Sequence, residues 1–406
     1  MFSYLGEINE IHLGFSKEKS KGNGMGPGDA IRIFKQLKDN KALKKGVLEG
    51  IEDMKIFIEK VGIDKISDMV ANIIRKPLLD YTMEQCILHN IPLTDNVLSG
   101  FFWNATKKEW DTLYTQRMII EDTPVLLVPK KYVVYSPFFA PTKYRQYFVL
   151  NYLQDIHLIK NSSLVKMRKD KSKYVTKKSI IAKEPIMDKS YLTSFTLNHL
   201  EIFNDFKKEA LKNEQSLRGD LLEKLNIDFV CKSLADKLIS IPPGKENAGA
   251  FHSVMIGIFE LLFYPTLLTP SKEDKFHDGR KRVDITFFVS SEYNYFISLA
   301  ERSQLPCSKL MIECKNYNAD AKNPELDQLS GRFSYSKGKI GILSCRNFID
   351  EDLFIHRCID TFKDGRGLII PVTDDNILNA LEKGEKCRES FEKILDMKFK
   401  KIVDNS

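Results

Sequence analysis

Two short stretches decide how this chain folds, Arg282-Val-Asp-Ile-Thr-Phe-Phe-Val289 and Lys309-Leu-Met-Ile-Glu-Cys-Lys315. Both are apolar runs of strand length, which predicts two buried strands. Each run contains an acid, Asp284 in the first and Glu313 near the end of the second. Because an unpartnered carboxylate is costly to bury, these two acids point to a site rather than to simple packing.

Strands and helices alternate around these two runs. We expect helices over residues 251–263, 293–302, 324–335 and 350–362, and two further strands over residues 340–344 and 367–371. Successive strands separated by helices imply parallel crossovers. The predicted fold class of this part is therefore α/β, with a mixed sheet flanked by helices.

The two acids suggest a metal site. If the two runs are neighbouring strands, Asp284 and Glu313 converge, and close carboxylates repel unless a cation lies between them. Oxygen ligands fit Mg²⁺ or Mn²⁺, and the backbone carbonyl of Cys314 would complete the inner shell. Lys315 shares a strand face with Glu313, because alternate residues of a strand lie on one face. Its ammonium would orient the attacking water and stabilise charge developing on a phosphate.

This pattern resembles the PD-(D/E)xK nuclease superfamily, which has the restriction-endonuclease-like fold. The resemblance covers about residues 248–372. It implies that Asp284 is the first strand acid and that Glu313 and Lys315 form the (D/E)xK element. Val283 stands where the named motif has proline.

The resemblance also assigns residues on helices. Glu260 corresponds to a helix acid that assists metal binding. Apart from the resemblance, His252 lies about two turns earlier on the same helix and is a candidate to line the site, with a surface or packing role as the alternative. Gln328 corresponds to a polar residue near the site. Arg332 stands where some relatives have tyrosine.

The sequence just before the Asp284 strand is basic. Arg280, Lys281 and Arg282 would bring three positive charges beside the metal. We interpret them, together with Arg332, as nucleic-acid contacts that position phosphates, with the solvated start of a strand as the alternative for the basic run.

A second Glu-x-Lys, Glu273-Asp-Lys275, lies in polar sequence. No apolar run precedes it, so we expect a loop that cannot hold a catalytic geometry.

The resemblance implies a Mg²⁺- or Mn²⁺-dependent endonuclease that hydrolyses DNA phosphodiester bonds, in restriction or anti-phage defence. The partners it implies are DNA, with a homo-oligomer and a partner protein of a defence system as further candidates. One alternative is a non-catalytic nucleic-acid-binding or assembly module whose acids are merely paired with Lys or Arg. Another is a repair or recombination nuclease.

The 406 residues are too many for one ordinary core. We expect an α+β recognition or regulatory domain over residues 1–160, a basic linker and helical connector over 161–245, and the nuclease-like domain over 246–406. In the first region, β-rich sequence occurs at residues 125–128 and 132–135. The glycine-rich run 22–28 matches no phosphate-binding loop, so we expect a turn that leads into a helix.

Residues 160–183 contain nine Lys and Arg residues and a single acid, Asp170. Their periodicity is poor, which predicts a solvated loop or linker. Sequence-independent contact with a nucleic-acid backbone is the alternative.

The overall composition narrows the class of protein. An apolar fraction of 43% indicates real hydrophobic cores, and a net charge of +7 permits a polyanionic partner without requiring one. The seven cysteines form no Cys-x-x-Cys pair, which is typical of reduced thiols in the cytoplasm. No apolar stretch is long enough to cross a membrane and the N-terminus lacks a signal-peptide pattern, so we expect a cytoplasmic protein without a membrane partner.

Overall fold

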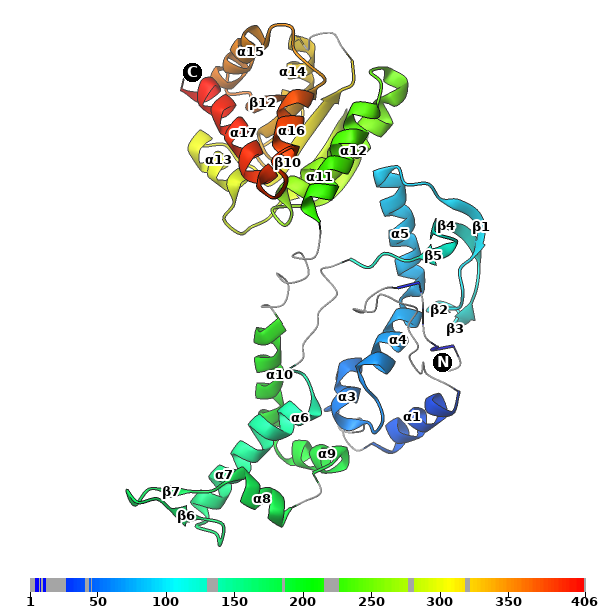
Figure 1. The fold of residues 1–406 in the computed structure, drawn as a ribbon, viewed down its shortest axis with the longest axis vertical. Helices are drawn as coiled ribbons and strands as arrows, with labels where there is room; N and C mark the ends of the chain where they lie inside the picture. Colours follow the sequence, from blue (N-terminus) through cyan, green and yellow to red (C-terminus); the bar gives the residue numbers. More distant parts are fainter. Residues whose placement is uncertain are drawn as a thin grey trace. The chain divides into compact units, whose positions relative to one another are not determined.

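The computed structural model describes residues 4–6, 8, 10–11, 27–40, 44, 46–129, 138–184, 187–214, 226–276, 281–317 and 322–404. The chain forms two compact units (Figure 1). Unit 1 comprises Met1–Glu84 and Pro92–Lys224, and unit 2 comprises Gln85–Ile91 and Leu225–Ser406. The fold is mixed α/β, as expected: unit 2 contains a five-stranded mixed sheet with helices, and unit 1 contains small antiparallel sheets.

In its described residues, unit 1 is built from helices and three small sheets. Its helices are α1 (Pro27–Asp39), η1 (Ile51–Asp53), α3 (Met54–Phe57), α4 (Ile63–Ile73), α6 (Pro141–Lys143), η3 (Tyr144–Val149), α7 (Leu150–Ile159), α8 (Lys177–Lys183), α9 (Lys189–Asn198) and α10 (Leu200–Glu214). Its strands are β1 (Thr94–Leu98), β2 (Phe102–Asn104), β3 (Glu109–Asp111), β4 (Tyr114–Ile120), β5 (Thr123–Val125), β6 (Lys166–Met167) and β7 (Lys173–Tyr174). The sheets are β1-β4-β5, β2-β3 and β6-β7, and all their pairings are antiparallel.

Several local expectations for unit 1 fall differently in the structure. The strand expected at 125–128 ends at Val125, and residues 132–135 lie outside the described residues. Most of the glycine-rich run, and with it the expected turn, lies outside the described residues, and its last two residues, Pro27 and Gly28, already belong to α1.

The basic stretch 160–183 is not the loop or linker that its charge predicted. It forms the β6-β7 hairpin followed by helix α8. Val175 and Ile180 are buried in a small core with Leu150 and Met187, and Thr176 caps α8 by accepting a hydrogen bond from the Ser179 N–H. A few apolar residues were enough to fold this segment. Their spacing was hard to recognise in the sequence because they are separated by many lysines.

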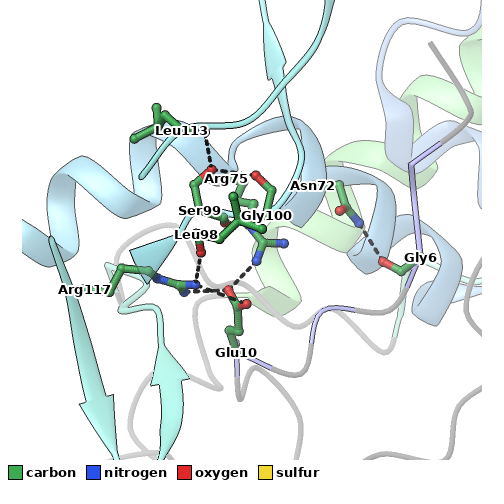
Figure 2. A network of polar contacts seen from close by, with 9 residues as sticks. All are labelled: Gly6, Glu10, Asn72, Arg75, Leu98, Ser99, Gly100, Leu113 and Arg117. Atoms are coloured by element: carbon green, nitrogen blue, oxygen red, sulfur yellow. Dashed lines mark hydrogen bonds and ion pairs between the residues drawn. The ribbon is translucent and has the colours of Figure 1, made fainter. Parts of the chain in front are cut away.

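A buried ion-pair network ties the N-terminal segment into unit 1 (Figure 2). The carboxylate of Glu10 pairs with both Arg75 and Arg117, whose side chains are almost fully buried. Arg75 also donates to the carbonyl of Ser99 at 2.7 Å, and Arg117 donates to that of Leu98 at 3.2 Å. Each buried guanidinium therefore has a carboxylate and a carbonyl partner, which offsets its loss of hydration.

Helix α5 (Arg75–His89) begins in unit 1, and its last residues belong to unit 2. The other helices of unit 2 are α11 (Ile227–Ser240), η5 (Lys245–Asn247), α12 (Ala248–Phe263), α13 (Tyr295–Ser303), α14 (Asn323–Ser330), α15 (Glu351–Lys363), α16 (Asp374–Leu381), η6 (Gly384–Lys386) and α17 (Cys387–Val403). Its strands are β8 (Leu267–Phe276), β9 (Lys281–Val289), β10 (Lys309–Lys315), β11 (Ile340–Cys345) and β12 (Leu368–Thr373).

The strands of unit 2 lie in the order β12-β11-β10-β9-β8. The pairs β10-β11 and β11-β12 are parallel, and β9 runs antiparallel to both of its neighbours. Helix α12 packs against β8, β9 and β10, α14 packs against β10 and β11, and α15, α16 and α17 pack against β12. From β9 to β12 the alternation of strands and helices was thus predicted correctly, whereas β8 was not predicted.

The polar segment that carries the second Glu-x-Lys was predicted as a loop, and that prediction is wrong. Residues 271–276 belong to β8, at the edge of the sheet. Polar and charged residues are common on edge strands, because one side of such a strand is free to face water.

Within the described ranges, no helix has the length and apolarity needed to cross a membrane.

Candidate active site

The register of the sheet brings the two strand acids together. In the antiparallel pair of β9 and β10, Met311 pairs with Thr286 and Ile312 pairs with Ile285. Continuing this register by one residue places Glu313 opposite Asp284, and residues directly opposite each other share one face. The backbone N–H of Cys314 donates to Oδ2 of Asp284 at 2.9 Å. The expected convergence of Asp284 and Glu313 follows from this pairing.

Glu313 is held by two polar side chains. Only 1% of Glu313 is exposed, and its Oε1 accepts hydrogen bonds from Nζ of Lys315, at 2.9 Å, and from the side-chain amide of Gln328. Nζ of Lys315 also lies 3.2 Å from Oε1 of Gln328. Helix α14 therefore supplies Gln328 to a closed triangle of hydrogen bonds that fixes the acid and the lysine together.

The second oxygen of Glu313 has unusual surroundings. Its Oε2 is buried and has no hydrogen-bond partner among the described residues. Burial raises the pKa of Glu313, and the nearby charge of Asp284 raises it further, while Lys315 acts in the opposite direction. A buried, unpartnered carboxylate oxygen beside a second carboxylate is the surrounding that a cation completes. Asp284 and Glu313 therefore fit a divalent metal ion.

The number of protein ligands also bears on the metal. No group of three or more His, Cys, Asp and Glu residues suited to hold a metal ion occurs within the described part of the chain. Mg²⁺ is commonly bound through one or two carboxylates while several waters remain. Asp284 and Glu313, with the carbonyl of Cys314, are compatible with that smaller set.

The thiol of Cys314 is not part of this chemistry. Alternate residues face opposite sides of a strand, so its side chain points away from Glu313 and Lys315, and only 5% of Cys314 is exposed. Burial raises the pKa of the thiol well above its ordinary value, so it stays protonated and is a poor nucleophile.

Glu260 has a different partner from the one expected. Its Oε2 lies 3.3 Å from Nε2 of His89, in the last turn of α5. His89 also lines a cavity of about 270 Å³ together with Ser253 and Gly257, which share a face of α12 with Glu260. Burial raises the pKa of Glu260 to about 7. In the structure this helix acid contacts His89 rather than either strand acid.

His252 is the residue of α12 that lies beside the strand acids, as its helical spacing suggested. It is 7% exposed, and its Nε2 lies 3.7 Å from Oδ2 of Asp284. Burial lowers the pKa of His252, whereas the charge of Asp284 raises it. Its Nδ1 is buried without a hydrogen-bond partner among the described residues. His252 therefore occupies the place beside Asp284 that was expected for Glu260.

Glu273 is a residue that the sequence reasoning set aside. In the pairing of β8 with β9, Lys272 lies opposite Ile285 and Asp274 lies opposite Val283, so Glu273 falls opposite Asp284. Its φ of 53° is in the left-handed region, which is strained for a residue other than glycine and recurs at functional sites. Three acids thus follow one another across β8, β9 and β10, and only the register could have revealed the first.

The basic residues expected to touch nucleic acid are only partly described. Arg280 and the side chain of Lys281 lie outside the described residues. Arg282 is exposed and lies 3.4 Å from Glu273. The guanidinium of Arg332 donates to the backbone carbonyls of Arg282 and Gln328, so it joins the end of α14 to the start of β9.

Comparison with known proteins identifies a domain family that covers mainly unit 1. Residues 1–140 match the model of a domain of unknown function (DUF8370). No curated protein and no solved structure matches the chain. The matched range ends well before β8, so it does not include the site strands.

Proposed function

We propose that this protein is a metal-dependent endonuclease that hydrolyses DNA phosphodiester bonds, with its active site in unit 2. The single observation that carries the proposal is Glu313: one oxygen is held by Lys315 and Gln328, and the other is buried without a partner beside Asp284. The proposal includes a PD-(D/E)xK type of fold for residues 246–406 and a cellular role in restriction or anti-phage defence.

The site residues have separate tasks in this proposal. Asp284, Glu313 and the carbonyl of Cys314 would hold Mg²⁺ or Mn²⁺, which when bound supplies Lewis-acid polarisation of a phosphate oxygen. Lys315 keeps its ammonium on the same face as Glu313, where it orients the attacking water and stabilises negative charge developing on the phosphate. Gln328 fixes the positions of the Lys315 and Glu313 side chains through hydrogen bonds of its amide.

Cleavage of supercoiled plasmid DNA tests the proposal. We expect nicking and linearisation with Mg²⁺ or Mn²⁺ and none with EDTA. Asp284→Ala, Glu313→Gln and Lys315→Ala should each reduce the cleavage rate by about 100-fold or more, because each removes a group that acts on the phosphate. Retained cleavage by Asp284→Ala or Lys315→Ala would contradict the proposal.

Asp274→Asn is the matched control. Asp274 lies in the same sheet and also pairs with a lysine: its Oδ2 accepts hydrogen bonds from Thr286, at 3.0 Å, and from Lys309, at 3.2 Å. The Asp274→Asn substitution removes the carboxylate that pairs with Lys309 and leaves the contacts of Glu313 unchanged. This variant should cut at close to the rate of the unaltered protein, and a loss as large as that of Glu313→Gln would mean that general damage to the sheet explains both results.

One observation favours a second candidate, a non-catalytic nucleic-acid-binding or assembly module on the same fold. The charge of Glu313 is already partly compensated by Lys315 at 2.9 Å. This candidate predicts salt-dependent retention of DNA or RNA that needs no metal and is unchanged in Glu313→Gln. The plasmid assay and a binding assay in EDTA separate the two candidates.

A further inference from the structure

Residues 160–183, which contain the β6-β7 hairpin and helix α8, form a strongly basic surface element of unit 1 that we call the basic arm. Figure 1 shows the hairpin extending beyond the neighbouring helices α7 and α8. Its cations are Lys160, Lys166, Arg168, Lys169, Lys171, Lys173, Lys177, Lys178 and Lys183.

These charges are not neutralised by the described residues of the chain. Among the described residues, no cation of the basic arm forms an ion pair, and all but Lys177 are exposed. The arm's one acid, Asp170, accepts hydrogen bonds from the N–H and the hydroxyl of Ser172, at 2.9 and 2.6 Å. A concentrated, uncompensated positive surface is the electrostatic signature of a polyanion site.

The base of the arm is fixed to unit 1. Val175 and Ile180 are buried. Nζ of Lys177 donates to the carbonyl of Gln146, outside the arm, at 2.6 Å, and within the arm Nζ of Lys173 donates to the side chain of Asn161 at 2.9 Å. The backbone that carries the cations is thus packed against unit 1, which distinguishes the arm from a solvated tether.

The turn of the hairpin keeps a positive charge at a position that favours glycine. Lys171 has a φ of 65°, and its N–H donates to the carbonyl of Arg168 at 3.0 Å. The N–H of Arg168 in turn donates to the carbonyl of Ser172 at 2.9 Å. Glycine or asparagine would adopt this conformation more readily than lysine, so the charge is present despite the backbone preference.

We infer that the basic arm binds the sugar-phosphate backbone of duplex DNA. Lys and Arg contacts to phosphates are strong and independent of base sequence, and a two-stranded ribbon fits the major groove of B-form DNA, whereas the major groove of A-form RNA is too narrow. An anionic membrane fits less well, because residues 168–173 at the tip are all polar or charged and Met167 is the one large apolar side chain exposed among residues 166–174. The inference rests on the proposed function, in which DNA is the substrate. It deepens that function by naming the part of unit 1 that binds the DNA.

Binding of the full chain to a duplex of about 30 base pairs, measured in EDTA at several salt concentrations, tests the inference. Replacing Lys166, Lys169 and Lys171 together by Gln should raise the Kd about tenfold or more at roughly 0.1 M salt and lower the slope of log K against log salt by about three. Lys171→Gly suits the turn conformation, so it removes one charge without harming the hairpin and should lower the slope by about one.

Lys108→Gly is the matched control. Lys108 also has a positive φ, 56°, in the turn between β2 and β3, but its neighbours include the acids Glu109 and Asp111. Its replacement should leave both Kd and slope unchanged. An unaltered Kd for the triple variant, or equal effects of Lys171→Gly and Lys108→Gly, would overturn the inference.

Two further measurements, binding to vesicles and cleavage of plasmid DNA, separate the remaining outcomes. Vesicles of phosphatidylglycerol and phosphatidylcholine test the membrane source of phosphate, and arm-dependent binding to vesicles but not to the duplex would overturn the inference. Because EDTA prevents metal-dependent cleavage, binding is read independently of cutting. Arm-dependent binding without any plasmid cleavage would contradict the proposed function and support the arm. If the protein cleaves plasmid DNA and the triple variant binds the duplex as tightly as the unaltered protein, the proposed function would be supported and the inference about the basic arm would be contradicted.

Discussion

Glu313 and Glu260 are the same side chain in two different surroundings. Glu313 has a lysine, an amide and a second carboxylate beside it, whereas the partner of Glu260 is the imidazole of His89. Burial alone raises the pKa of Glu260 to about 7, from an ordinary value of 4.5. A carboxyl whose pKa is raised in the folded state stabilises the fold while protonated and loses that contribution as pH rises through the folded pKa.

We therefore expect Glu260→Gln to reveal a pH-dependent difference in stability. Near pH 4.5 glutamine resembles the protonated acid, and the variant should melt close to the unaltered protein. Above pH 7 the unaltered protein must hold a partly buried carboxylate, so the variant should be the more stable of the two. Thermal unfolding of both proteins across this pH range provides the measurement, with the exposed Glu292→Gln as the control.

The opposite trend would identify a charged pair. If the unaltered protein gained stability relative to Glu260→Gln as pH rose, Glu260 would be acting as the anion of an ion pair with His89. If the two proteins differed in stability by the same amount at every pH, burial would not be raising the pKa of Glu260.

At the level of elements, close approach between β11 and its neighbours depends on one glycine. A Cβ on Gly341 would lie 2.9 Å from Cζ of Phe333 and 3.0 Å from the carbonyl oxygen of Met311 in β10. The second contact is with backbone, which cannot move aside without disturbing the strand that carries Glu313. The absence of a side chain at Gly341 is therefore a requirement of the sheet.

We expect Gly341→Ala to destabilise unit 2 by about 1–3 kcal/mol, as overpacking of a core usually does. Gly257→Ala in α12 is the opposite case, because its Cβ would meet Leu234 at an ordinary distance of 3.4 Å and alanine favours helix. That variant should be neutral or more stable by up to about 1 kcal/mol. Urea unfolding measures both, and equal effects at the two positions would contradict the close packing described at Gly341.

At the scale of the whole molecule, unit 2 is assembled from two separate segments of the chain. Its shorter segment, Gln85–Ile91, includes the last turn of α5. Leu88 packs against the large core of unit 2, and the hydroxyl of Ser253 donates to the carbonyl of Leu88 at 2.7 Å. The core of unit 2 is thus incomplete without residues that lie more than a hundred positions earlier in the sequence.

Two neighbouring residues of this turn test that assembly. Leu88→Ala should lower the stability of unit 2 by about 1–3 kcal/mol, because it withdraws apolar surface from the core. Ile87→Ala should change it by less than about 0.5 kcal/mol, because Ile87 is 63% exposed and alanine is the better helix former. Hydrogen exchange of α12 reports the effect locally, and similar protection in both variants would show that the turn does not belong to the core of unit 2.

Local sequence by itself determined the strands and helices from β9 to β12 and the shared strand face of Glu313 and Lys315. Apolar runs bounded by polar turns carry that information within a few residues, and alternation along a strand follows from its period of two. The same reasoning found His252 through its helical position. It failed where many charged residues interrupt the apolar periodicity, as in the hairpin of the basic arm and in β8.

Tertiary structure alone decided which side chains meet across strands and segments. The register of β8 against β9 brought Glu273 opposite Asp284, the end of α5 gave Glu260 a histidine partner, and the fold left one oxygen of Glu313 buried and unpartnered. The physical reason is common to all three: register and long-range packing depend on the free energy of the whole assembly, which no local stretch of sequence contains.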